Sequence, residues 1–210
     1  MPILFTQESP AMGVWKITET WQDMLEYFKD NDNYSYDIQK IQSDKRKQEW
    51  LAVRLLLKYL HGPDVYISYL ENGTPVLQNS KYSISISHTK GFAAVILSKS
   101  KNPGIDIEYL SGRAWKLHEK YLGENELKMF DFLQDSRYRE KLATICWCAK
   151  ETAFKALQHN EVDFINHLQI LPFTLSGKGT LLLKETKSLI QQVFNINYQI
   201  TEDYIVTWKE

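Results

Sequence analysis

The sequence WCAKETAFK, residues 147–155, repeats the spacing of WLAVRLLLK, residues 50–58. In both stretches a tryptophan is followed four residues later by a charged side chain, Glu151 or Arg54, and after four more residues by a lysine. This spacing places the three side chains along one face of an α-helix. So short a match can arise by chance. If it instead reflects a duplication, the chain consists of two similar halves, each built around one of these helices.

Both stretches belong to longer segments in which apolar residues have helical spacing. That spacing predicts a helix over residues 45–60 and a second helix from about residue 135 to residue 157, preceded by a mainly helical stretch over residues 115–133. Alternating or continuous apolar runs predict strands over residues 65–70, 82–87, 92–98, 104–109, 168–175, 180–184 and 198–208. The order of elements predicts an α+β pseudo-dimer of two similar halves, each with a long helix packed on a small antiparallel sheet.

The turn-like sequence Asn102-Pro103-Gly104 separates two strand-like runs and is the best candidate for a domain boundary. We therefore divide the chain into an N-terminal half, residues 1–103, and a C-terminal half, residues 104–210.

The composition is that of a globular protein without a strongly charged surface. The 210 residues include 25 Lys and Arg against 26 Asp and Glu, so bulk attraction to nucleic acid or to an anionic membrane is not expected. The longest uninterrupted apolar run, residues 92–97, is too short to cross a bilayer, and the opening MPILFTQESP does not resemble a secretory leader. Cys146 and Cys148 are poorly spaced for a disulfide or a zinc site, so we expect free thiols and a cytoplasmic location.

The predicted strand GIDIE, residues 104–108, carries two carboxylates. Because side chains alternate along a strand, Asp106 and Glu108 share one face, with Cα atoms roughly 6.7 Å apart, while the two isoleucines face the core. Carboxylates this close repel each other unless a cation lies between them, and oxygen ligands select hard ions such as Mg²⁺. The alternative is an ordinary solvated face of an edge strand.

Two further polar clusters are candidates for the same chemistry. Glu151 and Lys155 are one helical turn apart, which provides a third carboxylate next to a cation; the alternative is a surface ion pair worth a few tenths of a kcal/mol. The sequence SHTKG, residues 87–91, lies at the tip of a predicted hairpin. Its hydroxyl, imidazole and ammonium groups suit a phosphate, and the alternative is an ordinary polar turn.

Three motifs taken in order resemble the 4′-phosphopantetheinyl transferase superfamily. They are ISISH at residues 84–88, GIDIE at residues 104–108 and WCAKETAFK at residues 147–155. The closer likeness is to the two-lobed type that activates surfactin synthetase. The resemblance implies transfer of the 4′-phosphopantetheine group from coenzyme A to a serine of an apo acyl carrier or peptidyl carrier protein, with Mg²⁺ as cofactor and 3′,5′-ADP as the released product.

The resemblance also implies roles for individual residues. Asp106, Glu108 and Glu151 would hold Mg²⁺, and Glu151 or Glu108 would accept the proton of the serine hydroxyl. Lys155 would contact the α-phosphate and stabilise the leaving 3′,5′-ADP. The other expected contacts with coenzyme A are Arg46, Arg54, Ser87, His88 and Lys150. The N-terminal half would thus contact coenzyme A, and the C-terminal half would supply the metal-binding and catalytic residues.

The chain departs from the family pattern at Gly73-Thr74-Pro75, where many members have Gly-Lys-Pro. That lysine helps to hold coenzyme A, so Thr74 leaves the binding of the nucleotide end open, and Lys81 or Lys90 is the nearest replacement. Glu126 lies where the family often carries a glutamate, and we expect it on a helix surface.

Two other functions are compatible with these residues. A different Mg²⁺-dependent phosphotransferase would use the same acidic residues to turn over a nucleotide without any carrier protein. A non-catalytic binder of carrier protein or coenzyme A would fit the missing lysine at Thr74. We expect a monomer, because contact between two fused halves replaces a subunit interface, and the sequence indicates no particular carrier protein.

Overall fold

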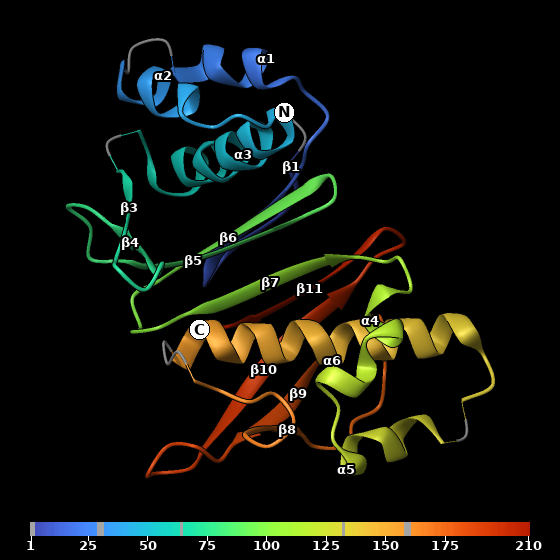
Figure 1. The fold of residues 1–210 in the computed structure, drawn as a ribbon. Coiled ribbons are helices and arrows are strands. Elements are labelled where there is room, and N and C mark those ends of the chain that lie inside the picture. Colours follow the sequence, from blue (N-terminus) through green and yellow to red (C-terminus); the bar gives the residue numbers. More distant parts are fainter. Residues whose placement is uncertain (1–2, 29–31, 64, 132, 158–160) are drawn as a thin grey trace. The chain divides into compact units, whose positions relative to one another are not determined.

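The computed structural model describes residues 3–28, 32–63, 65–131, 133–157 and 161–210. The chain forms two compact units, Met1–Lys99 (unit 1) and Ser100–Glu210 (unit 2). Figure 1 shows helices and antiparallel strands in both, so the expected α+β class is confirmed. The boundary expected after residue 103 lies four residues beyond the end of unit 1.

Unit 1 contains a long helix and an antiparallel sheet. Its elements are β1 (Ile3–Glu8), β2 (Ala11–Lys16), α1 (Trp21–Leu25), η1 (Glu26–Phe28), α2 (Asp32–Gln39), α3 (Asp44–His61), β3 (Ile67–Tyr69), β4 (Pro75–Leu77), β5 (Ser83–Thr89) and β6 (Phe92–Ser98). Four strands pair in the order β1-β2-β6-β5, and β3 pairs with β4. Helix α3 packs against β2 and β6, and every residue of β6 is buried.

The ends of α3 follow from local side chains. The Ser43 hydroxyl accepts a hydrogen bond from the backbone N–H of Arg46 and caps the helix. At the other end Gly62 adopts a φ of 114°, which a residue with a side chain rarely adopts, and the helix ends there.

Unit 2 also contains a long helix and an antiparallel sheet, and its sheet is larger than that of unit 1. Its elements are β7 (Gly104–Tyr109), α4 (Arg113–Lys116), η2 (His118–Lys120), α5 (Glu124–Leu127), η3 (Lys128–Phe130), α6 (Ser136–Leu157), β8 (Leu168–Ile170), β9 (Lys178–Glu185), β10 (Gln192–Ile200) and β11 (Tyr204–Lys209). The strands pair in the order β7-β11-β10-β9-β8. The orange helix α6 in Figure 1 packs against β7 and β11.

A glycine sets the distance between α6 and the edge strand β7. A Cβ atom added at Gly104 would collide with the carbonyl oxygen of Thr152, which lies in the middle of α6. Gly104 therefore allows the helix to lie close against the strand, and this close approach brings the polar residues of β7 next to those of α6.

The helices α3 and α6 and the strand β7 lie where the sequence predicts them. The single strand expected over residues 198–208 is wrong, because a turn at residues 201–203 divides it between β10 and β11. The helical stretch expected over residues 115–133 consists of four short helices. Within the described residues no helix has both the length and the apolar character that a bilayer crossing requires, and Cys146 and Cys148 are buried free thiols.

Candidate active site

The carboxylates of β7 lie on the strand face that α6 covers. Asp106 and Glu108 are two and four residues after Gly104, so all three residues share that face. Asp106 is only 5% exposed, which contradicts the alternative of an ordinary solvated strand face. Ile105 and Ile107, which alternate with the carboxylates along the strand, are buried as well.

Lys155 joins the helix to this strand. Its Nζ donates hydrogen bonds to Asp106 Oδ1 at 2.7 Å and to the carbonyl oxygen of Ile105 at 3.0 Å. The Asp106 side chain is 7% exposed and that of Lys155 is 27% exposed. The ammonium group therefore stands at the edge of the cluster with one side open to a ligand.

The pKa of Glu151 depends on the other charged residues of the cluster. The pKa of its carboxyl is raised from an ordinary value of 4.5 to about 7, first by burial, then by the negative charges of Asp106 and Glu108, against the lowering effect of Lys155. Because both carboxylates of β7 act on Glu151, the three acids form one electrostatic group. The structure therefore brings together the three residues expected to bind the metal and the lysine expected to contact phosphate.

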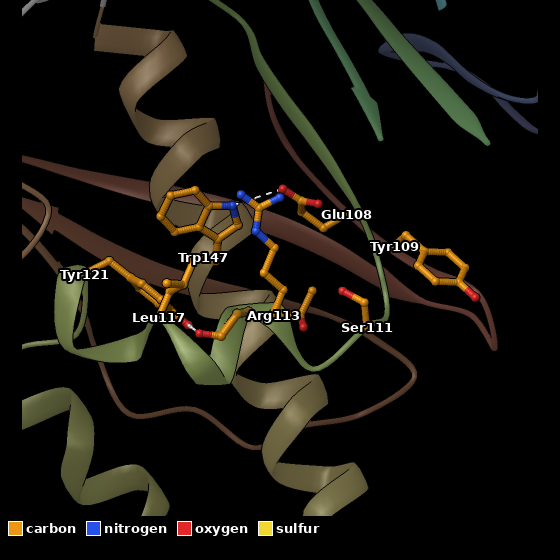
Figure 2. Close-up of a pocket in the computed structure, with 9 residues that line it drawn as sticks. Glu108, Tyr109, Ser111, Arg113, Leu117, Tyr121 and Trp147 are labelled. Carbon is orange, nitrogen blue, oxygen red and sulfur yellow. Dashed lines mark hydrogen bonds between the residues drawn. The ribbon is translucent and has the colours of Figure 1, made fainter. Parts of the chain in front are cut away.

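Glu108 borders a small cavity of about 100 Å³ (Figure 2). The indole Nε1 of Trp147 donates a hydrogen bond of 3.1 Å to Glu108 Oε1, drawn as a dashed line in Figure 2. Arg113, from α4, also lines this cavity and places a cation close to the acidic cluster. Arg113 cannot be recognised from the sequence, because no motif surrounds it and only the fold brings α4 beside β7.

The three carboxylates fit a divalent cation by chemistry and charge. Carboxylate oxygens are the ligands that Mg²⁺ prefers. The pKa of Glu151 is raised first by burial and then by the negative charges of Asp106 and Glu108, and a cation among the three acids would relieve that repulsion. Among the residues that the structure describes, no three His, Cys, Asp or Glu side chains are arranged as a ready-made metal cage.

Lys150 does not fit the expected contact with coenzyme A. It is completely buried, and its Nζ donates hydrogen bonds to Glu126 Oε2 (2.6 Å), to the carbonyl oxygen of Tyr121 (2.6 Å) and to that of Phe164 (2.8 Å). An ammonium group has three N–H donors, and here all three are used inside unit 2. Lys150 is therefore a structural residue and not a phosphate ligand.

Glu126, the partner of Lys150, is also placed differently from the expectation. It is 2% exposed rather than on a helix surface. Its Oε1 accepts a hydrogen bond from the backbone N–H of Ile170, and its Oε2 accepts one from that of Gly123. The buried Lys150–Glu126 pair thus connects α6, α5 and β8.

Unit 1 contains a larger cavity, of about 480 Å³, between α3 and the strands β3 and β5. Three residues expected to contact coenzyme A, Arg46, Arg54 and His88, all line it. Arg46 Nη1 lies 3.1 Å from His88 Nε2. The guanidinium of the buried Arg54 stacks on the ring of Trp50, and burial lowers the pKa of Arg54. The cavity wall is thus cationic.

The other two expected features of unit 1 lie outside this cavity. Ser87 is buried on β5 and points to the opposite face from its neighbours Ile86 and His88, which line the cavity. The structure therefore does not bring Ser87 and His88 to the same surface. The backbone N–H of Thr74 donates to Asn72 Oδ1 in the turn before β4, and Thr74 is not part of the cavity wall.

Comparison with known families agrees with this geometry. A family model described as the 4′-phosphopantetheinyl transferase superfamily matches residues 102–208, which is just over half of the chain. The matched segment contains both β7 and α6, and with them the complete acidic cluster. A search of curated proteins gave no match.

Proposed function

Since the chain belongs to the 4′-phosphopantetheinyl transferase superfamily, and is by that membership a transferase, we propose that it moves the 4′-phosphopantetheine group of coenzyme A to a serine of an apo acyl carrier or peptidyl carrier protein. The observation that carries this proposal is the charge cluster of Asp106, Glu108, Glu151 and Lys155 inside the matched segment. Three acids that repel one another and a lysine beside them are the residues that a Mg²⁺-dependent phosphoryl transfer needs.

The acidic cluster is the proposed metal site. Asp106, Glu108 and Glu151 would hold Mg²⁺, which supplies neutralisation of the negative charge that develops on the pyrophosphate. The support is the donor type of these residues and the influence of Asp106 and Glu108 on the pKa of Glu151.

The bonds that change are those of one phosphorus atom. The serine oxygen of the carrier protein forms a bond to the phosphorus that carries the pantetheine arm, and the bond from that phosphorus to the oxygen of 3′,5′-ADP breaks. Glu151 or Glu108 accepts the proton of the serine hydroxyl. Lys155, which is part-exposed beside Asp106, contacts the α-phosphate and stabilises the negative charge on the leaving group.

The cavity of unit 1 is the proposed contact with the nucleotide end of coenzyme A. Arg46, Arg54 and His88 line it and are suited to a phosphate, which carries a charge of −1.5 to −2 as a monoester. Thr74, outside this wall, does not contribute the cation that many family members have at its position.

Mass spectrometry of intact carrier proteins tests the proposal. The protein is incubated with coenzyme A, Mg²⁺ and a panel of apo acyl and peptidyl carrier proteins. A carrier that gains the mass of phosphopantetheine only when Mg²⁺ is present supports the transfer. Breakdown of coenzyme A without a modified carrier would instead indicate another Mg²⁺-dependent phosphotransferase, and binding without any product would indicate a non-catalytic binder.

A further inference from the structure

Glu108 accepts a directed hydrogen bond from a tryptophan on the helix that covers its strand. Trp147 lies on α6, 39 residues away along the chain, and its Nε1 donates to Glu108 Oε1 at 3.1 Å, as Figure 2 shows. An indole N–H can only donate, so the atom that faces it must be an acceptor, and a carboxylate oxygen meets that need. Because the two oxygens of a carboxylate are rigidly joined, a bond to Oε1 also restricts where Oε2 can lie.

Two aromatic rings hold the indole of Trp147 in place. The Tyr121 ring meets it edge-on, with ring centroids 5.1 Å apart and an angle of 70° between the planes. The Phe164 ring lies against it at a tilt of 45°, with ring centroids 5.7 Å apart. Tyr121 is completely buried, and its hydroxyl donates a hydrogen bond to the carbonyl oxygen of Ala143. The direction of the indole N–H is therefore set by packing as well as by Glu108.

Lys150 connects the backbones of those two aromatic residues. Its Nζ donates hydrogen bonds to the carbonyl oxygen of Tyr121, 29 residues away, and to that of Phe164, 14 residues away. The buried ammonium group thus joins the segments that carry the two rings to α6, the helix that carries Trp147. A continuous series of contacts therefore leads from Lys150 through the two rings to Trp147 and then to Glu108.

We propose that Trp147 is a positioning residue, which holds the carboxylate of Glu108 in the orientation that binds a divalent cation, and that Lys150 keeps the rings around Trp147 in place. A hydrogen bond to a metal-binding carboxylate orients it before the ion arrives, and loss of such a partner typically lowers metal affinity by about 10- to 100-fold. Asp106, by contrast, is held directly by Lys155. That a divalent cation occupies the acidic cluster rests on the proposed function; the contacts of Trp147 do not.

The first experiment measures the affinity of the whole protein for Mg²⁺ alone, by calorimetry at pH 8 and without coenzyme A. Trp147→Phe keeps an aromatic ring between its neighbours but removes the N–H group, and we expect it to bind Mg²⁺ about tenfold more weakly. The matched control is Trp115→Phe, which removes an indole that stacks on His118 and is not among the described residues that line the cavity beside Glu108. Its affinity for Mg²⁺ should stay unchanged, and an equal loss in both variants would overturn the inference.

The second experiment follows the ¹H–¹⁵N signal of the indole N–H of Trp147, which is assigned by its absence from Trp147→Phe. Glu108→Gln keeps an acceptor oxygen but removes the charge, so it should move this signal. Mg²⁺ should move the signal in the unmodified protein but not in Glu108→Gln. Lys150→Met combined with Glu126→Gln should move it too, because the two rings lose their common anchor. Circular dichroism shows whether each variant is folded, and an unchanged signal in the folded double variant would remove Lys150 from the inference.

The outcomes separate this inference from the proposed function. If Trp147→Phe binds Mg²⁺ as tightly as the unmodified protein, the positioning role is wrong, whether or not phosphopantetheine is transferred. An unmodified protein that neither binds Mg²⁺ nor shows a moved Trp147 signal would also overturn it. If the affinity for Mg²⁺ depends on Trp147 and the signal depends on Glu108, but no carrier protein is modified, the proposed function fails and the positioning role stands.

Discussion

The two units of the chain share one order of elements but differ in the charges on the corresponding surfaces. In unit 1 the order is β2, α3, β3, β4, β5, β6, and in unit 2 it is β7, α6, β8, β9, β10, β11. In both units the first of these strands pairs with the last, and the last pairs with the one before it. Unit 1 adds β1 beyond β2. The shared order supports the duplication that the spacing of the two tryptophans suggests.

The difference between the units appears beside the glycine that faces each long helix. A Cβ atom at Gly13 of β2 would meet Leu56 of α3, as one at Gly104 would meet α6. Two residues after these glycines unit 1 has the buried Trp15 and unit 2 has Asp106. On the helices, Arg54 stands where unit 2 has Glu151.

The two units differ in how well the side chains at these corresponding positions suit a protein interior. A buried aromatic ring and an arginine stacked on Trp50 suit the interior of a folded unit. The acidic cluster does not, because burial and then the negative charges of Asp106 and Glu108 raise the pKa of Glu151 and so disfavour its charged form. At these positions unit 1 therefore has a buried tryptophan and an arginine, whereas unit 2 has carboxylates, and the acidic cluster of unit 2 is the candidate active site.

The largest expected effect is that of Glu151→Arg, which gives unit 2 the arginine that unit 1 has at the corresponding position, Arg54. We expect Glu151→Arg to lower the rate of phosphopantetheine transfer by about ten-thousandfold or more, because it replaces a proposed metal ligand by a cation. Glu151→Ala and Asp106→Ala should abolish transfer as well, with the fold intact by circular dichroism. The control is Glu161→Gln, at an exposed carboxylate outside the cluster. Normal turnover by Glu151→Ala would remove this residue from the mechanism.

The second contrast is between Lys150, the residue before Glu151, and its counterpart in unit 1, and it concerns stability. Lys150 corresponds to the buried Val53 of unit 1 in the repeat, so a charge occupies a place where an apolar side chain also folds. We expect Lys150→Met to reduce the free energy of unfolding in urea by about 3 to 5 kcal/mol, because Glu126 remains buried without its cation. Adding Glu126→Gln to it should recover most of the loss.

A matched pair on the surface provides the comparison for that measurement. Lys187 and Glu161 form an ion pair whose glutamate side chain is 91% exposed, and Lys187→Met should change the free energy of unfolding by no more than about 1 kcal/mol. If Lys150→Met costs as little as Lys187→Met, the buried pair does not hold α5 and β8 to α6.

The third contrast uses the lysines that end the two repeats. We expect Lys155→Ala to lower kcat by about a hundredfold with a smaller change in KM for coenzyme A, because Lys155 is proposed to stabilise the leaving group. Lys58 is its counterpart and donates to the carbonyl oxygen of Tyr27, so Lys58→Ala should leave kcat unchanged. An effect of Lys155→Ala on KM alone would assign this lysine to ground-state binding.

The sequence predicts those parts of the fold and site that depend on local patterns. The helices α3 and α6 have regular apolar spacing, and alternation along β7 places Asp106 and Glu108 on one face. The turn between β10 and β11 has the sequence Thr-Glu-Asp, without glycine or proline, so the local pattern predicts one continuous strand there.

Contacts between distant residues explain what sequence analysis missed. Lys150 is adjacent to Glu151, yet it is turned about 100° around the helix towards Glu126, which is 24 residues away. Nothing in the local sequence indicates that this glutamate is buried.

The last expected effect is a dependence of stability on pH that comes from Glu151 in unit 2. The pKa of Glu151 is raised from 4.5 to about 7 in the folded protein, so this group contributes stability that is fully present below pH 4.5 and is lost as the pH rises through 7. Without metal, the free energy of unfolding in urea should therefore fall over this range. Glu151→Gln should flatten the fall, because a neutral amide does not titrate.

Added Mg²⁺ should stabilise the unmodified protein more at pH 8 than at pH 5, since the carboxylate that would bind it is ionised only at the higher pH. The contrasting variant is Arg54→Gln in unit 1: Arg54 stays charged throughout this range, so its removal should leave the slope with pH unchanged. A slope that Glu151→Gln does not alter would mean that burial and the charges of Asp106 and Glu108 together do not raise the pKa of Glu151.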